Sequence, residues 1–68
     1  MYGKVKVYNE ISGYGFIECE DGHDVFVNYT EILGMKFRVL KRGDMVEFEI
    51  VNGVNGSEAA NVTIIQEP

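Results

Sequence analysis

The sequence predicts an all-β fold in which five strands close into a small barrel. Apolar and polar residues alternate along several stretches, which is the pattern of a strand with one buried face. Turn-forming Gly, Asn and Asp residues separate these stretches, and no segment has the length and apolar spacing of an independent helix. The expected strands are Tyr2–Asn9, Tyr14–Cys19, Asp24–Asn28, Asp44–Val51 and Ser57–Ile65.

The first strand shows the alternation over its whole length. Val5 and Val7 fall on one face, and Lys4, Lys6 and Tyr8 fall on the other. The first of these faces should turn toward the core. The second is polar and basic, and should face solvent.

The second and third strands should form a hairpin around Glu20–His23, because the pair Asp21-Gly22 favours a tight turn. After the third strand, residues 29–33 suit a single helical turn. Residues 34–43 are expected to form a long, partly ordered loop, which is unusual in so small a protein and could be functional.

The fourth strand places Val46, Phe48 and Ile50 on one face, so we expect Phe48 in the core. Gly and Asn residues over 52–56 form the turn that leads into the last strand, which is rich in β-branched residues. So small a set of strands must protect its edges from pairing with other chains, and closure into a barrel does this. Glycines at the start of the second strand would let it bend as a small barrel requires.

Length and composition limit the chain to one small domain, expected over residues 1–68. A single cysteine, Cys19, cannot form an internal disulfide, which fits a reducing compartment. The sequence has no signal-peptide pattern and no apolar run of membrane-spanning length, so we expect a cytoplasmic protein without a membrane partner. The formal net charge of −5 and the isoelectric point of about 4.6 argue, as bulk properties, against nucleic acid as a partner.

The expected hairpin has an unusual second face. One face is small and aliphatic and can form the core, whereas Tyr14, Phe16 and Phe26 share the opposite face with polar neighbours. These rings are either a second core layer beneath the long loop or an exposed platform. Because every nucleobase has a π-face, exposed rings beside cations suit single-stranded nucleic acid.

Four motifs together resemble the bacterial cold-shock proteins, over nearly the whole chain. They are Gly-Lys-Val-Lys at 3–6, Gly-Tyr-Gly-Phe-Ile at 13–17, Asp-Val-Phe-Val at 24–27 and Ala-Ala-Asn-Val at 59–62. The two central motifs are similar to the ribonucleoprotein motifs of that family. The resemblance implies a five-stranded antiparallel Greek-key barrel of the oligonucleotide-binding type (OB-fold). It also implies binding of single-stranded RNA and DNA with low sequence specificity, and a role as RNA chaperone and antiterminator.

The resemblance further implies which residues bind. Lys6 would approach a phosphate or a base edge, Asn9 and Asp24 would contact base edges, and six aromatic rings would stack on bases. The full nucleic-acid-binding set is Lys6, Tyr8, Asn9, Tyr14, Phe16, Asp24, Phe26, Asn28, Tyr29, Phe37 and Arg38.

Several positions depart from the family pattern. Val7 stands where an exposed tryptophan is usual, Ser12 where a lysine is usual, and Asn28 where a histidine is usual. Each departure removes a stacking ring or a potential cation, so we expect weaker and less salt-sensitive binding than in typical relatives. Four of the six cations lie over residues 36–42, and this segment could supply a local positive rim.

No pattern in the sequence indicates an enzyme, a cofactor or a metal site. His23 lies in an acidic turn with too few defined neighbours to hold a metal, and no base is spaced to activate Cys19. A different kind of function stays open. The barrel could serve as a dimerising or protein-interaction module, with rings paired across a two-fold interface or with residues 34–43 as the hinge of a strand exchange.

Overall fold

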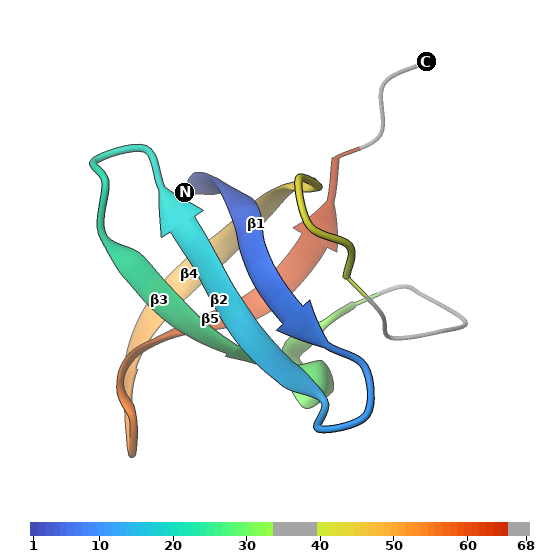
Figure 1. The fold of residues 1–68 in the computed structure, drawn as a ribbon. Helices are drawn as coiled ribbons and strands as arrows, with labels where there is room; N and C mark the ends of the chain where they lie inside the picture. The colour runs from blue at the N-terminus through green and yellow to red at the C-terminus, as the bar shows by residue number, and fades with distance from the viewer. Residues whose placement is uncertain (34–39, 66–68) are drawn as a thin grey trace.

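The computed structural model describes residues 1–33 and 40–65, and within them five strands and one short 3-10 helix (Figure 1). The predicted strands and the predicted helical turn are confirmed, with strand ends that agree within two residues. Among these residues, no helix has the length and apolar character needed to cross a membrane. The elements are β1 Tyr2–Asn9, β2 Tyr14–Cys19, β3 Asp24–Asn28, η1 Tyr29–Glu31, β4 Met45–Gly53 and β5 Gly56–Ile64.

The strands close into a barrel in the order β1-β2-β3-β5-β4, which confirms the predicted architecture. Neighbouring strands pair antiparallel, with one exception: β3 and β5 run parallel where Phe26 lies opposite Glu58. An odd number of strands cannot alternate in direction all the way around a closed ring, so one parallel pair is unavoidable. The expected antiparallel arrangement is corrected at this pair alone.

The interior of the barrel is filled by apolar side chains from every strand and from two segments between strands. Phe48 is 2% exposed, as predicted, and Cys19 lies on the inner face at 4%. Burial of this kind supplies most of the stabilisation of so small a domain. The buried set is Val5, Ile17, Cys19, Val25, Val27, Ile32, Leu40, Val46, Phe48, Ala59 and Val62.

A bulge in β1 reverses the alternation of that strand. Val5 lies opposite Ile17 and Val7 lies opposite Phe16, so β1 has one extra residue, Lys6, between two consecutive residues of β2. Because side chains alternate with a period of two, an extra residue exchanges the two faces of everything that follows it.

The side chains that follow the bulge therefore lie on the opposite face of β1 from the one that the sequence predicted. Val7 is 49% exposed on the outer face, whereas Tyr8 is partly buried and packs against the core. The prediction that Val7 faces inward and that Tyr8 shares the outer face was wrong. Gly15 permits this arrangement, since a Cβ atom there would overlap the carbonyl oxygen of Val7.

Candidate nucleic-acid interface

Three rings form one cluster on the outer face of the β2–β3 hairpin, and we call Tyr14, Phe16 and Phe26 the aromatic surface. The ring centroid of Phe26 lies 5.6 Å from that of Tyr14, with 28° between the planes, and 5.9 Å from that of Phe16, at 79°. Tyr14 is 45% exposed and Phe16 is 40% exposed, while Phe26 is half-buried. The rings are thus open to solvent on one side, as an exposed platform requires.

The register of the hairpin brings these rings together. Phe16 lies directly opposite Phe26, and Tyr14 lies opposite Asn28. The alternate positions of the two strands, such as Ile17 and Val25, are buried in the core. The core is therefore complete without the aromatic surface, and its rings remain available for a ligand.

Lys6 and Asp24, two of the predicted binding residues, meet beside this surface. The Lys6 Nζ atom lies 2.9 Å from Asp24 Oδ2, and both side chains are exposed. The pair spans β2, the strand that carries Phe16, because β2 lies between β1 and β3. The hydrogen bond and the charge of Asp24 raise the pKa of Lys6 above its usual value.

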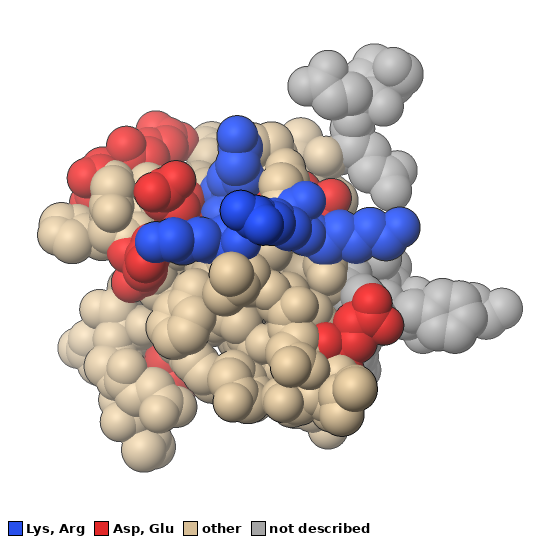
Figure 2. Space-filling model, viewed as in Figure 1, with Lys and Arg blue, Asp and Glu red and all other residues tan. Residues whose placement is uncertain are grey.

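Basic side chains form a band across the face that has β1 and β2 in front (Figures 1 and 2). An uncharged area borders this band, and acidic side chains gather at one end of it (Figure 2). The local field on this face is therefore more positive than the net charge of −5 suggests. The described cations of the chain are Lys4, Lys6, Lys41 and Arg42.

Asn9 and Asn28 hold the turns at one end of the aromatic surface. The Oδ1 atom of Asn9 accepts the backbone N–H groups of Ile11 at 2.9 Å and Ser12 at 3.0 Å. The Oδ1 atom of Asn28 accepts the N–H of Thr30 at 3.1 Å and its hydroxyl at 3.2 Å, which caps η1. Both amide oxygens therefore serve the local backbone, and a contact with a base edge would come from the amide NH₂ groups.

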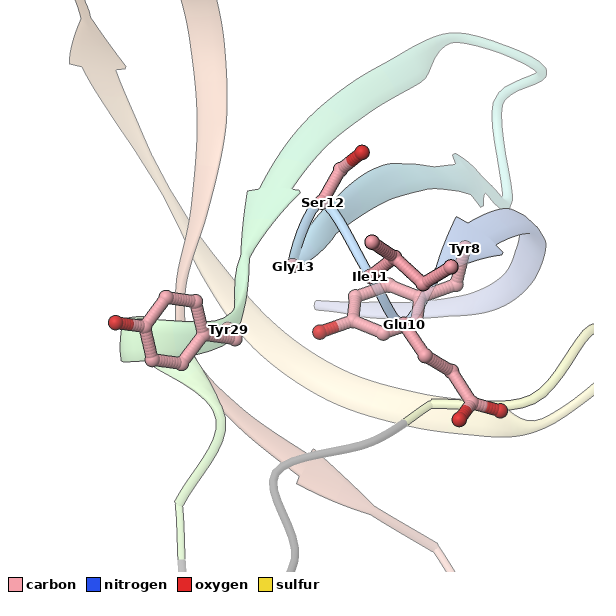
Figure 3. Close-up of a pocket in the computed structure, with 6 residues that line it drawn as sticks. All are labelled: Tyr8, Glu10, Ile11, Ser12, Gly13 and Tyr29. Carbon is pink, nitrogen blue, oxygen red and sulfur yellow. The ribbon is translucent and has the colours of Figure 1, made fainter.

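A hollow of about 410 Å³ opens at the same end, between Tyr29 on one side and the β1–β2 loop on the other (Figure 3). Tyr29 lies against Gly13, which has a φ of +80° and whose carbonyl oxygen accepts the N–H of Tyr29 at 2.8 Å. Burial, and secondarily the nearby Glu10 carboxylate, raise the pKa of Tyr8. The residues that line the hollow are Tyr8, Glu10, Ile11, Ser12, Gly13 and Tyr29.

The structure thus gathers most of the predicted binding residues on one side of the barrel. Phe37 and Arg38 lie outside the described residues. Sequence reasoning missed Glu10 and Ile11, which line the hollow, because a loop has no periodicity from which to infer a direction. The one available signal was the pair of glycines around Tyr14: a Cβ atom at Gly13 would meet the Tyr29 ring, and one at Gly15 would meet the backbone of Val7.

Two other polar features lie away from the aromatic surface. The Nδ1 atom of His23 lies 3.0 Å from Asp21 Oδ2 in an exposed turn, and this contact raises the pKa of His23. Cys19 is buried, which raises the pKa of its thiol and makes it a poor nucleophile. Within residues 1–33 and 40–65, no group of three or more His, Cys, Asp or Glu side chains could hold a metal ion.

Known proteins resemble this chain in sequence and in fold. The family described as 'Cold-shock' DNA-binding domain matches residues 1–65. Cold shock protein CspB of Bacillus caldolyticus is 57% identical over 60 residues, which cover 88% of this chain and 91% of that protein. The cold shock-like protein of Thermotoga maritima is 46% identical over 66 residues, 97% of this chain and 100% of that protein. The solved structure of drosophila Unr CSD456 matches 96% of this chain with a TM-score of 0.77 and 26% identity, and this chain spans 26% of that longer one.

Proposed function

The chain belongs to the cold-shock domain family, and we propose that it binds single-stranded RNA and DNA, with low sequence specificity, through the aromatic surface. Proteins of this family bind nucleic acid and are not enzymes, as the sequence predicted for this chain. The observation that carries the proposal is the exposure of Tyr14 and Phe16 beside the cation Lys6.

Stacking on these rings would supply most of the affinity. Each base that lies on an aromatic side chain contributes roughly 1–3 kcal/mol, whatever its identity. Phe26 holds Tyr14 and Phe16 in place through ring contacts, so little side-chain freedom is lost when bases arrive. Lys6 would contact a phosphate or a base edge of the bound strand. The amide NH₂ groups of Asn9 and Asn28 would add contacts at one end of the aromatic surface.

The same arrangement would support a role as RNA chaperone or antiterminator. Bases that lie flat on separate rings cannot pair with one another, so bound RNA is held out of hairpins. Stacking, which accepts every base, suits this task because the target is any unpaired segment. A cytoplasmic location stays a prediction, as do the contacts assigned to Phe37 and Arg38.

A binding isotherm with labelled heptathymidine tests the proposal. We expect a one-to-one complex, and Phe16→Ala should weaken it by about 1–3 kcal/mol while the fold is retained, because this side chain is 40% exposed. Tyr2→Ala is the matched control, since it removes a ring of similar exposure that is not part of the aromatic surface. Unchanged affinity in Phe16→Ala would remove the aromatic surface from the binding site.

The alternative, a dimerising or protein-interaction module, predicts a different outcome for the same surface. Exposed rings can pair across a two-fold interface as well as with bases. Sedimentation with and without heptathymidine separates the two functions. A dimer that forms without the oligonucleotide and does not bind it would favour the alternative, whereas a monomer that forms a one-to-one complex favours nucleic-acid binding.

A further inference from the structure

The hollow beside the aromatic surface differs in chemistry from the rest of the face. Two rings, Tyr8 and Tyr29, contribute to its lining, and Glu10 and Ser12 add a carboxylate and a hydroxyl. Among the described residues that line it, none is a lysine or an arginine. Its volume of about 410 Å³ lies in the range of small-ligand sites, which is roughly 300–1,000 Å³.

We propose that this hollow takes one nucleobase of the bound strand, and that Glu10 makes guanine the preferred base there. The inference rests on the proposed function, because the base must arrive as part of a bound strand. It goes beyond that function, because stacking alone accepts every base equally.

The location of the hollow makes it the continuation of the binding face. Gly13 directly precedes Tyr14, and Tyr29 directly follows Asn28, so the hollow begins where the aromatic surface ends. A strand that follows the rings would reach it with its next base. The aromatic walls then offer stacking of the same kind as the aromatic surface.

The charge of the hollow decides which part of a nucleotide can enter. A phosphate next to the Glu10 carboxylate would be repelled, and no described lining residue is a cation that could offset this. A base is uncharged and presents N–H groups, which a carboxylate can accept. The described lining residues are therefore better suited to a base than to the phosphate backbone.

Hydrogen-bond geometry then favours guanine. A carboxylate only accepts hydrogen bonds, and its two oxygens match two adjacent donors. The Watson–Crick edge of guanine offers such a pair, N1–H and N2–H. Thymine and uracil offer one N–H flanked by two carbonyl oxygens, and the amino groups of adenine and cytosine adjoin a ring nitrogen that accepts hydrogen bonds. Each of these four bases would therefore place an acceptor atom against one of the two carboxylate oxygens, which is unfavourable.

Hydrogen bonds hold the backbone of the loop that carries Glu10, whereas the Glu10 side chain is free to change its rotamer. Asn9 accepts hydrogen bonds from Ile11 and Ser12 through its side chain, and from Gly13 at 2.8 Å through its backbone carbonyl. Glu10 itself is exposed and projects from the rim beside the Tyr8 ring (Figure 3). Its carboxylate points away from Tyr29 in Figure 3, so a rotation of the side chain would bring it onto the edge of a base bound in the hollow.

The test uses the full chain and heptathymidine in which one position, varied in turn, carries guanine, hypoxanthine or adenine. Hypoxanthine is guanine without the 2-amino group, so the two purines stack alike and differ in one donor. We expect the best guanine heptamer to bind roughly 5- to 30-fold more tightly than the matching hypoxanthine and adenine heptamers. Glu10→Gln should bring the guanine-to-hypoxanthine ratio close to one.

Glu47→Gln is the matched control, because it also removes one exposed negative charge but lies on β4, outside the hollow. The ratio of the affinities for the guanine and hypoxanthine heptamers should be unchanged in this variant. Chemical shifts of the Ile11 and Ser12 amides should also respond more to the guanine heptamer than to heptathymidine.

The outcomes separate this inference from the proposed function. Equal binding of all heptamers by the unmodified protein, or a guanine ratio unchanged in Glu10→Gln, would overturn the guanine preference and leave the aromatic surface as proposed. Failure to bind any heptamer would overturn both.

Discussion

The ammonium group of Lys6 lies 2.9 Å from the carboxylate of Asp24, so this cation beside the aromatic surface is already paired in the free protein. The two residues come from β1 and β3 and span the strand between them. A phosphate that binds Lys6 must therefore compete with a charge of the protein itself. Ionic contacts should contribute less to affinity here than the number of lysines alone suggests.

The salt dependence of binding measures this contribution. Each phosphate contact to a single strand changes the slope of log affinity against log salt by roughly −0.7. We expect a slope for heptathymidine shallower than about −3, and Lys6→Gln should flatten it by about 0.7 and weaken binding. Fluorescence titrations over a range of salt concentrations provide the measurement. A slope of about −4 or steeper would show that more cations take part than we infer.

The exposure of Val7 predicts a gain of function. This side chain is 49% exposed and lies directly opposite Phe16, on the face that carries the rings. Val7→Trp should add a stacking ring and tighten heptathymidine binding by about 1–3 kcal/mol. Val51→Trp, which adds the same ring at a site of similar exposure on β4, should leave the affinity unchanged. Equal affinities of Val7→Trp and the parent protein would place the nucleic acid elsewhere.

Gly15 should tolerate no side chain. A Cβ atom there would meet the carbonyl oxygen of Val7 and the Cα of Tyr8, both backbone atoms that cannot yield without separating β1 from β2. Gly15→Ala should lower the free energy of unfolding by about 3 kcal/mol, a large part of the stability of a domain this small. Urea denaturation gives the value.

Gly22→Ala is a useful comparison for that experiment. Gly22 has a φ of +91°, but a Cβ atom there would meet no other atom within 4 Å, so only backbone strain opposes the change. Its cost should be about 1–2 kcal/mol. If Gly15→Ala cost no more than this, the close approach of β1 and β2 would not be what requires glycine at position 15.

The contact between His23 and Asp21 predicts a small dependence of stability on pH. The carboxylate raises the pKa of His23 in the folded protein above its ordinary value of 6.5. The folded state therefore binds this proton more tightly than the unfolded state. The stabilising contribution is fully present below pH 6.5 and is lost as the pH rises through the folded pKa.

NMR titration of the His23 ring protons tests this prediction directly. The midpoint should lie above 6.5 in the parent protein and return toward that value in Asp21→Asn, which keeps the size of the side chain and removes its charge. A midpoint at or below 6.5 in the parent protein would show that the contact does not form in solution.

Local patterns were sufficient to predict the strands and to place the three rings on one face of the hairpin, opposite the aliphatic face, whereas the structure decided that this face is exposed. Tyr14, Phe16 and Phe26 alternate with small or aliphatic residues, and this alternation fixes which face each occupies once the strand is straight. The turn residues indicated the ends of the strands for a similar reason, since Gly22 and Gly56 have positive φ angles that glycine adopts readily.

The tertiary structure alone decided the faces of Val7 and Tyr8, the pairing of Lys6 with Asp24, and the hollow that includes Glu10. Each depends on how two distant segments approach each other. The bulge at Lys6 lies where β1 passes close to Gly15 in the closed barrel, and the alternation of residues along β1 does not show where such an extra residue falls. The parallel pair of β3 and β5 is likewise a property of the ring of five strands and not of either strand.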